Sequence, residues 1–151
     1  MSKTSVFTKN PALEPLSVLI GKWNVKMSHV ALPNPLTWQA SFEWLDNAFI
    51  IGRWDGKNEI PRTIFLIGRN ENKPSNKYSM FSYDSRGVSR IYDMSFEKGV
   101  WKFWREDSDF FQCFEGKINE EADAITGNGK NSFDGGKKWE PDFTITYARI
   151  K

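Results

Sequence analysis

Residues 13–23 read Leu-Glu-Pro-Leu-Ser-Val-Leu-Ile-Gly-Lys-Trp, so a short apolar stretch runs directly into a glycine, a lysine and a tryptophan. Asn10-Pro11 precedes this stretch and Gly21 ends it, and a proline at the start with a glycine at the end is typical of a helix. We therefore predict a short helix over 11–20. A helix of two turns needs tertiary contacts to be stable, so we expect its apolar face to cover the open end of a barrel. The members of that face are Leu13, Leu16 and Leu19 or Ile20.

About ten strand-like segments follow this helix, separated by turn signals such as Asp46-Asn47 and Lys98-Gly99. Successive short strands with such turns favour an all-β fold. We expect a ten-stranded antiparallel up-and-down barrel with a short N-terminal capping helix, forming a single domain over residues 1–151. The predicted strands span 22–29, 37–45, 48–54, 62–69, 77–84, 88–97, 100–107, 110–118, 123–132 and 139–150.

Composition excludes several classes of function. The formal net charge is +2 with both signs interspersed, which leaves no basic stripe for a nucleic acid. No apolar run approaches the length of a membrane span. Cys113 is the only cysteine and His29 the only histidine, so we expect no disulfide, no metal site and no cofactor. A lone thiol and the lack of an N-terminal apolar run favour a cytoplasmic protein.

Period-two alternation predicts which side chains fill the barrel. Residues 37–45 alternate most clearly, and their inward set is Trp38, Ala40, Phe42 and Trp44. The corresponding sets on other strands are Trp23/Val25/Met27/His29, Val88/Arg90/Tyr92/Met94/Phe96, Trp101/Phe103/Arg105 and Phe143/Ile145/Tyr147/Arg149. The strands 62–69 and 110–118 are apolar on both faces, so alternation does not assign them. Their outer faces are candidates for contact with the helix or with a second copy of the chain, and a homodimer is therefore possible on this pattern.

Three arginines and two tyrosines lie in phase with these inward aromatic residues. Arginine keeps its charge in a protein, so an inward guanidinium requires an anion or several acceptors. The main inward carboxylate expected from the alternation is Glu115. A surplus of guanidinium over carboxylate leaves room for the carboxylate or phosphate of a ligand. The alternative is that the arginines reach solvent or backbone carbonyls.

The chain resembles known barrel families. The opening helix, Gly21-Lys22-Trp23 and the late Arg149 are similar to the lipocalin and fatty-acid-binding-protein arrangement, which implies that Arg149 packs over Trp23 at the base of the barrel. Tyr147-Ala148-Arg149 resembles, in reversed order, the Arg-x-Tyr pair that fatty-acid-binding proteins direct at a carboxylate. The runs 83–88, 134–136 and 139–147 resemble an uncharacterised bacterial family of lipocalin-like barrels, which lies within the calycin-like group and implies a fold but no activity.

The pattern thus predicts an intracellular protein that binds a small hydrophobic or amphipathic anionic ligand in the barrel cavity. Three alternatives stay open. The same pocket could serve an isomerase or hydrolase that uses His29 or a carboxylate as acid or base. The aromatic residues could fill the barrel completely and leave an interaction module. The chain is also similar in outline to nitrobindin, which holds haem through a late histidine; here Tyr147 occupies that neighbourhood. The expected ligand-binding residues are Arg90, Tyr92, Arg105, Tyr147, Trp38, Phe42, Trp44, Met94, Phe103, Phe143 and His29.

Overall fold

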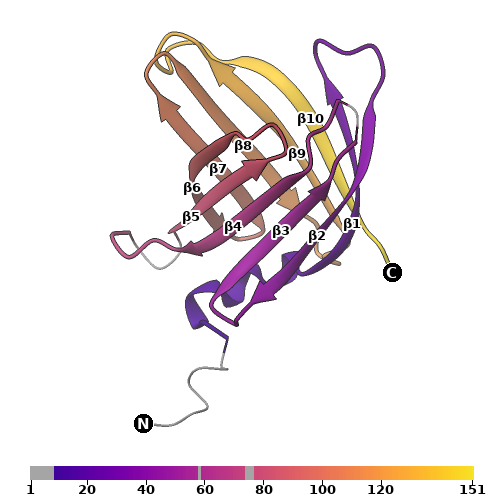
Figure 1. Ribbon diagram of the computed structural model, residues 1–151, viewed down its shortest axis with the longest axis vertical. Coiled ribbons are helices and arrows are strands. Elements are labelled where there is room, and N and C mark those ends of the chain that lie inside the picture. Colours follow the sequence, from indigo (N-terminus) through magenta and orange to yellow (C-terminus); the bar gives the residue numbers. More distant parts are fainter. Residues whose placement is uncertain (1–8, 58, 74–76) are drawn as a thin grey trace.

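Ten antiparallel strands close into a barrel in the computed structural model, which describes residues 9–57, 59–73 and 77–151 (Figure 1). One 3₁₀ helix, η2 (Pro11–Leu19), precedes the strands. The strands are β1 (Gly21–His29), β2 (Leu36–Leu45), β3 (Phe49–Asp55), β4 (Thr63–Arg69), β5 (Lys77–Asp84), β6 (Ser89–Glu97), β7 (Val100–Asp107), β8 (Phe110–Ile118), β9 (Ala124–Ser132) and β10 (Glu140–Arg149). All ten predicted strands are present, and each observed boundary lies within one residue of the predicted one.

Each strand pairs with its neighbours in the sequence, and β1 closes the barrel by pairing with β10 from Trp23↔Arg149 to His29↔Phe143. The predicted all-β, up-and-down antiparallel barrel is confirmed. Tight turns form at the residues that predict them. Asp46 and Asn47 both have φ 53°, a left-handed conformation, in the turn that the Ala48 amide closes by donating to the Leu45 carbonyl at 3.0 Å. A short connection of this kind places consecutive strands side by side.

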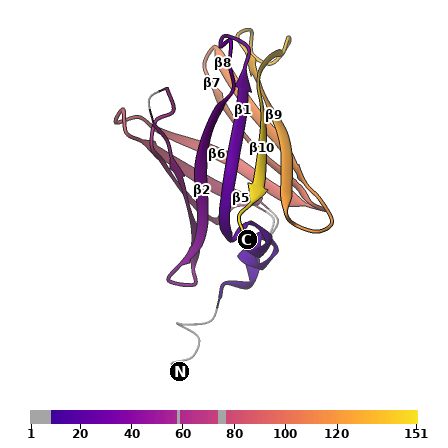
Figure 2. The same ribbon diagram turned by 90° about the vertical axis from the view of Figure 1, so that its right-hand side faces the viewer.

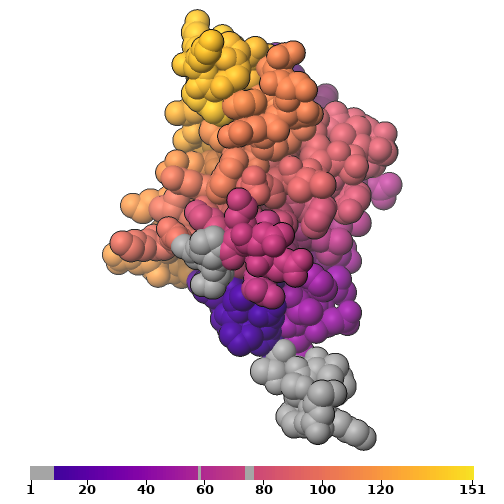
Figure 3. Space-filling model, turned by 90° about the vertical axis from the view of Figure 1, so that its left-hand side faces the viewer, coloured from indigo at the N-terminus to yellow at the C-terminus, as the bar shows by residue number. Residues whose placement is uncertain are grey.

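Helix η2 lies across one end of the barrel (Figure 2). Three residues per turn place Leu13, Leu16 and Leu19 on one face, and all three are fully buried. The Asn10 side chain accepts a hydrogen bond from the Ala12 amide at 3.0 Å and so caps the helix. The space-filling view shows the indigo helix packed directly against the lower edge of the strands (Figure 3). The helix therefore plugs this end, as the sequence predicts.

Arg149 attaches helix η2 to the barrel wall. Its guanidinium carbon lies 4.1 Å from the centre of the Trp23 ring, which confirms the packing implied by the family resemblance. The same group donates hydrogen bonds to the carbonyls of Ile20 at 2.6 Å, of Ala122 at 2.8 Å and of Val18. Gly21 makes the approach possible, because its φ is +130° and a Cβ there would lie 2.6 Å from Arg149 Nη1. One cation thus satisfies three carbonyls from two segments of the chain, the end of η2 and the connection between β8 and β9.

The inward-facing rows agree with the alternation, and the closed register assigns the two ambiguous strands. Thr63, Phe65 and Ile67 of β4 are buried, whereas Ile64 is exposed. On β8, Phe114 is buried opposite Phe103. The expectation that Glu115 faces inward is wrong: it is exposed and its carboxylate lies 3.9 Å from the Lys102 ammonium on the outer surface. Apolar residues on both faces of β8 conceal its phase in the sequence.

Glycines at inward positions of β9 make room for aromatic rings. A Cβ at Gly129 would lie 2.2 Å from the Phe143 ring, and one at Gly127 would lie 2.9 Å from the Phe114 ring. The two rings cover these glycines and lie nearly parallel, with an interplanar angle of 18°. The interior on this side of the barrel is therefore built from flat aromatic surfaces over bare backbone.

We expect Arg149→Met to lower the free energy of unfolding by about 3 kcal/mol, because three carbonyls lose a charged donor while the methionine keeps much of the apolar contact. Urea unfolding of the two proteins measures the difference. Arg53→Met is the matched control: its guanidinium pairs with Glu43 on the exposed surface, so the change should stay within about 0.5 kcal/mol. An equal decrease in the free energy of unfolding in both variants would contradict the role of Arg149 in attaching η2 to the barrel.

Candidate functional site

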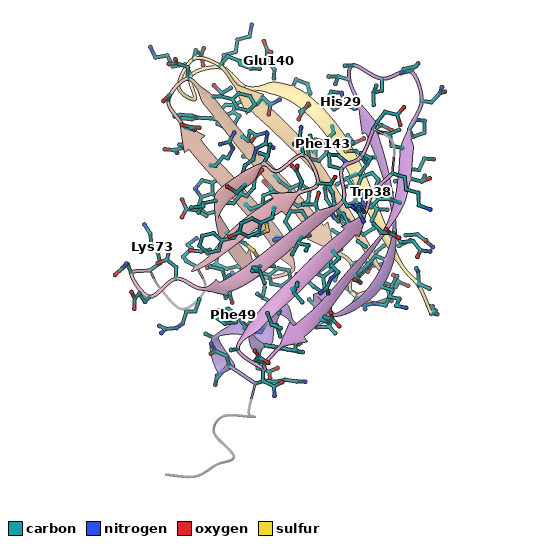
Figure 4. All side chains as sticks on the ribbon, in the orientation of Figure 1. His29, Trp38, Phe49, Lys73, Glu140 and Phe143 are labelled. Carbon is teal, nitrogen blue, oxygen red and sulfur yellow. The ribbon has the colours of Figure 1, made fainter. Side chains whose placement is uncertain are left out.

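A cavity of about 340 Å³ lies inside the barrel toward the end opposite η2. Side chains from opposite walls of the barrel line it, together with Pro61 and Arg86 from the loops. Figure 4 places His29 and Phe143 toward this end, whereas Phe49 lies beside the helix. The volume is at the small end of the range for ligand sites. The apolar lining residues are Met27, Trp54, Phe65, Tyr92, Phe103, Phe114 and Phe143, and the polar ones include His29, Asp84, Arg90, Gln112, Asn131 and Asp142.

The lower half of the barrel is packed with side chains. Phe42 packs edge-on against Trp101 with 5.9 Å between ring centres, and Tyr147 packs edge-on against Trp23 at 6.3 Å. Met94 is fully buried here. The barrel is therefore neither completely filled nor open throughout: its base is a solid core and its upper part is hollow.

The cavity brings together part of the predicted ligand-binding set. His29, Arg90, Tyr92, Phe103 and Phe143 line it. The others lie elsewhere: Trp44 is half-buried beneath the Lys9 ammonium, 5.5 Å from its ring, and Trp38 packs on Trp54. Phe42, Met94 and Tyr147 belong to the packed base, and Arg105 bonds to a lining residue rather than lining the cavity itself. Sequence reasoning did not select Trp54, Phe65, Gln112 or Phe114, and the last three lie on β4 and β8, the two strands that alternation did not assign.

Arg90 presents its charge to the cavity without a direct partner. It is half-buried on β6, and among the residues that the structure describes none forms a hydrogen bond or an ion pair with its guanidinium. Asp84 lies near enough for the Arg90 charge to contribute to lowering the Asp84 pKa, but that carboxylate bonds to another group. A guanidinium in this position can bind an incoming carboxylate through two parallel hydrogen bonds.

Asp84 is held by Arg86 at the rim. Its two carboxylate oxygens accept hydrogen bonds from Arg86 Nε at 3.2 Å and Nη2 at 2.8 Å, and the Arg86 amide donates a third bond at 2.9 Å. These bonds lower the pKa of Asp84 to about 2, with the side-chain bonds from Arg86 as the main cause. Asp84 is thus ionised and its charge is compensated, so it opposes an anionic ligand only weakly.

Gln112 is a further donor in the cavity, and Arg105 sets its orientation. Arg105 Nε donates to the Gln112 side-chain oxygen at 2.6 Å. Because a guanidinium can only donate, the amide oxygen must face Arg105 and the amide NH₂ must face away from it. No described residue accepts a hydrogen bond from that NH₂. Arg105 is itself 17% exposed, lies 3.4 Å from Asp107, and stacks over Phe110.

His29 and Asp142 form a pair at the rim. His29 Nε2 lies 2.7 Å from the Asp142 carboxylate, and Nδ1 accepts a hydrogen bond from the Ala31 amide at 3.0 Å. The β10 register shifts between Pro141 and Phe143, so Asp142 lies at a bulge, a feature that redirects side chains. An Nδ1 that accepts a bond carries no proton, and Nε2 donates to Asp142. Both ring nitrogens are therefore engaged.

The interior carries indole N–H groups without acceptors. The buried Nε1 atoms of Trp38, Trp54 and Trp101 have no hydrogen-bond partner among the described residues. Trp54 Nε1 lies near the Tyr147 hydroxyl, where it offsets a small part of the rise in the Tyr147 pKa that burial causes, but no hydrogen bond of normal geometry joins them. An unsatisfied buried donor costs about 1–3 kcal/mol, and of the three residues only Trp54 lines the cavity.

Two further hollows, of about 670 and 720 Å³, lie on the outside of the barrel. Outward-facing residues such as Lys22, Ser41 and Arg53 line the first, and Lys26, Thr37 and Thr146 the second. Over the described part of the chain, no three His, Cys, Asp or Glu side chains gather to hold a metal ion. No helix within the described ranges is long and apolar enough to span a membrane.

No family model matches the chain, and no curated protein matches it by sequence. Solved structures do resemble it. Rv2717c from M. tuberculosis has a TM-score of 0.64 at 14% identity, covering 95% of this chain and 99% of that one. A redesigned beta barrel, b11L5F_LGL, has a TM-score of 0.49 at 12% identity and coverages of 89% and 94%. EF1p2_mFAP2b bound to DFHBI has a TM-score of 0.45 at 11% identity and coverages of 90% and 97%. At this identity the likeness to Rv2717c shows the fold alone.

The Asp84–Arg86 pair predicts a specific dependence of stability on pH. Because the folded-state pKa of Asp84 is about 2, below its ordinary value, its contribution is present above about pH 4 and is lost as the pH falls to about 2. Asp84→Asn should therefore be less stable than the wild type at pH 7 and equally stable near pH 2. Urea unfolding at several pH values tests this.

Arg86→Gln is the companion variant for that measurement. It removes the main cause of the lowered Asp84 pKa, so it should also converge with the wild type near pH 2. A gap between wild type and Asp84→Asn that stays constant from pH 7 to pH 2 would show that the carboxylate contributes through shape and not through its charge.

Proposed function

We propose that this protein binds a small, largely apolar ligand with an anionic group inside the barrel cavity. The observation that carries the proposal is which charged and polar groups of the cavity already have partners and which do not. Both carboxylates that line the cavity, Asp84 and Asp142, already have partners, whereas the Arg90 guanidinium and the Gln112 NH₂ have none among the described residues. A cavity whose carboxylates are already compensated, and whose Arg90 charge is not, favours a ligand that brings a negative charge.

The walls favour a flat apolar body. Phe103 and Phe114 stack with 4.6 Å between ring centres, and Tyr92 packs edge-on against Phe103 at 5.1 Å. Such rings present both faces and edges, which suit a planar ring in offset or edge-on contact. An aromatic carboxylate of one or two rings matches the volume, the walls and the donors together.

The same features support a position in the calycin-like group, with its lipocalin-like barrels, and a single domain over residues 1–151. The support is the arrangement at the base: a capping helix, Trp23 on the first strand and Arg149 over it on the last. The free thiol of Cys113 is compatible with the cytoplasm. A homodimer would form through the outer face of β4, β5 and β6, where Ile64, Phe81, Tyr83 and Ile91 are exposed side by side.

The competing functions receive less support from the site. A general base needs a free nitrogen, and both nitrogens of His29 are engaged. For haem, a tyrosinate ligand at Tyr147 is unfavourable, because the side chain is buried in the packed base and burial raises its pKa. His29 offers no free ligating nitrogen either. Binding of an anionic ligand is therefore the function we propose.

The test is the affinity for 4-isopropylbenzoate, measured by isothermal titration calorimetry. Arg90→Met should weaken binding about 10- to 100-fold, because a charge-assisted hydrogen bond in a desolvated site is lost. Arg53→Met, on the outer surface, should bind as the wild type does. The uncharged 4-isopropylbenzamide should bind the wild type and Arg90→Met alike. Unchanged affinity of Arg90→Met for the acid, or no binding of the acid to the wild type, would overturn the proposal.

A further inference from the structure

The loop between β1 and β2, residues 30–35, is exposed along its whole length and carries no charge. It reads Val-Ala-Leu-Pro-Asn-Pro, so five of its six side chains are apolar. Val30 is 69% exposed, and Leu32 is exposed as well. Exposed turns and loops are ordinarily rich in glycine and small polar residues. An uncharged apolar loop in solvent is therefore a candidate contact with an apolar partner.

Backbone hydrogen bonds hold this loop in one shape. The Val30 amide donates to the Asp142 carbonyl at 3.0 Å, and the Leu32 amide donates to the His29 carbonyl at 3.0 Å. The Ala31 amide donates to His29 Nδ1. The two prolines of the loop restrict its backbone further. Because the loop is already ordered, contact with a partner costs little conformational entropy.

The loop between β9 and β10 carries a second exposed apolar group. Phe133 and Trp139 stand at its two ends; Phe133 is 61% exposed, and Trp139 is exposed as well. Phe133 packs against Phe110 with 5.2 Å between ring centres, and Trp139 packs against Phe111 at 6.5 Å. These contacts hold both rings in place although solvent reaches them. A tryptophan in such a position is typical of a surface that meets the boundary between membrane and water.

Both loops project from the end of the barrel opposite η2 (Figure 2). Figure 4 places His29, which adjoins Val30, at one corner of this end and Glu140, which adjoins Trp139, at the other. His29 and Asn131, near the starts of the two loops, line the cavity between them. A surface that contacts both loops therefore covers the mouth of the cavity.

The shape of this end suits a deformable partner. The two apolar groups are separated by the cavity mouth, so a rigid partner, including a second copy of the chain, would touch the loops and leave a void between them. Protein interfaces require close shape complementarity. A lipid bilayer is fluid, and it takes up separate apolar side chains at the boundary of its headgroups and acyl chains.

The charges at this end argue against electrostatic attachment. Residues 30–35, 105–110 and 133–140 carry five carboxylates and three cations. These are Glu106, Asp107, Asp109, Asp134 and Glu140 against Arg105, Lys137 and Lys138. Anionic lipids attract a surplus of basic residues, which this end lacks. The apolar side chains must supply the attachment, so the expected lipid is zwitterionic.

We propose that the open end of the barrel docks onto the surface of a zwitterionic lipid bilayer. The loop 30–35 and the rings of Phe133 and Trp139 enter the headgroup region, and the mouth of the cavity faces the lipid. Apolar molecules dissolved in the bilayer then reach the cavity without crossing bulk water. Docking requires no ligand at Arg90, so it goes beyond the proposed function and is tested separately from it.

Co-sedimentation with phosphatidylcholine vesicles tests the docking. The wild type should sediment with the vesicles at low and at high salt, because salt screens charges and not apolar contacts. An equimolar mixture with phosphatidylglycerol should not bind it more tightly. Val30→Ser/Leu32→Ser and Phe133→Ser/Trp139→Ser should each lower the partition coefficient about tenfold, because each removes two apolar side chains from the lipid.

Leu45→Ser/Phe49→Ser is the matched control. Both residues are exposed, but they flank the β2–β3 turn at the end of the barrel that η2 closes, so vesicle binding should not change. Urea unfolding checks that each variant is folded. If a loop variant does not fold, the wild type is studied by NMR with bicelles that contain spin-labelled phosphatidylcholine. Amide signals of 30–35 and 133–139 should then broaden, and those of the β2–β3 turn should not.

Three results would overturn the docking. The first is no sedimentation with phosphatidylcholine vesicles, even if a concentration-dependent dimer that both loop variants abolish identifies a second copy as the occupant. The second is binding that needs phosphatidylglycerol and is lost at high salt. The third is an equal loss in the control variant, or equal broadening of the β2–β3 turn. Vesicle binding by a protein that does not bind 4-isopropylbenzoate would leave the docking in place and remove the proposed function.

Discussion

The contact between Arg149 and Trp23 is the interaction on which the rest of the structure depends. Strands β1 and β10 must pair for the barrel to close, and these two residues are partners in that register. The guanidinium then reaches past the strand edge to the carbonyls of Ile20 and Val18, so that closure of the barrel and attachment of η2 occur together. The apolar side chains of η2 close this end of the barrel, and the Arg149 guanidinium there is bonded to backbone carbonyls. Any solvent-accessible interior must therefore open at the other end.

The distribution of hydrogen-bond partners decides what the cavity can bind. Three arginines donate hydrogen bonds within the protein: Arg149 to backbone carbonyls, Arg86 to Asp84, and Arg105 to Gln112. Arg90 does not. The three inward arginines of the sequence therefore have three roles. Arg149 attaches η2 at the base, Arg105 orients the Gln112 amide, and Arg90 presents its charge to the cavity. Residue type and phase are the same in each case, and only the identity of the neighbours differs.

Much of the architecture could be predicted because the signals are local. Turn residues such as Asp46 and Asn47 mark the hairpins, and alternation within 37–45 assigns an inward face without knowledge of any other strand. The candidate site was predicted only in part. Alternation shows that Phe42 and Phe103 both face inward, but it does not show their depth, and one lies in the packed base while the other lines the cavity. Depth depends on the stagger of the strands around the closed barrel. Glu115 was misplaced because β8 is apolar on both faces.

The sequence by itself determined the strand boundaries, the capping helix and the inward rows of the strands that alternate clearly, because each follows from the order of residues within a few positions of one another. The tertiary structure alone decided which polar groups are paired and where space remains. Asp142 meets His29 across the closure of β1 and β10, and Trp54 meets Phe65 and Trp38 on adjacent strands. Such partners are brought together by the closed register, and a hydrogen bond exists only where two groups come within about 3 Å, a distance that no pattern along the chain specifies.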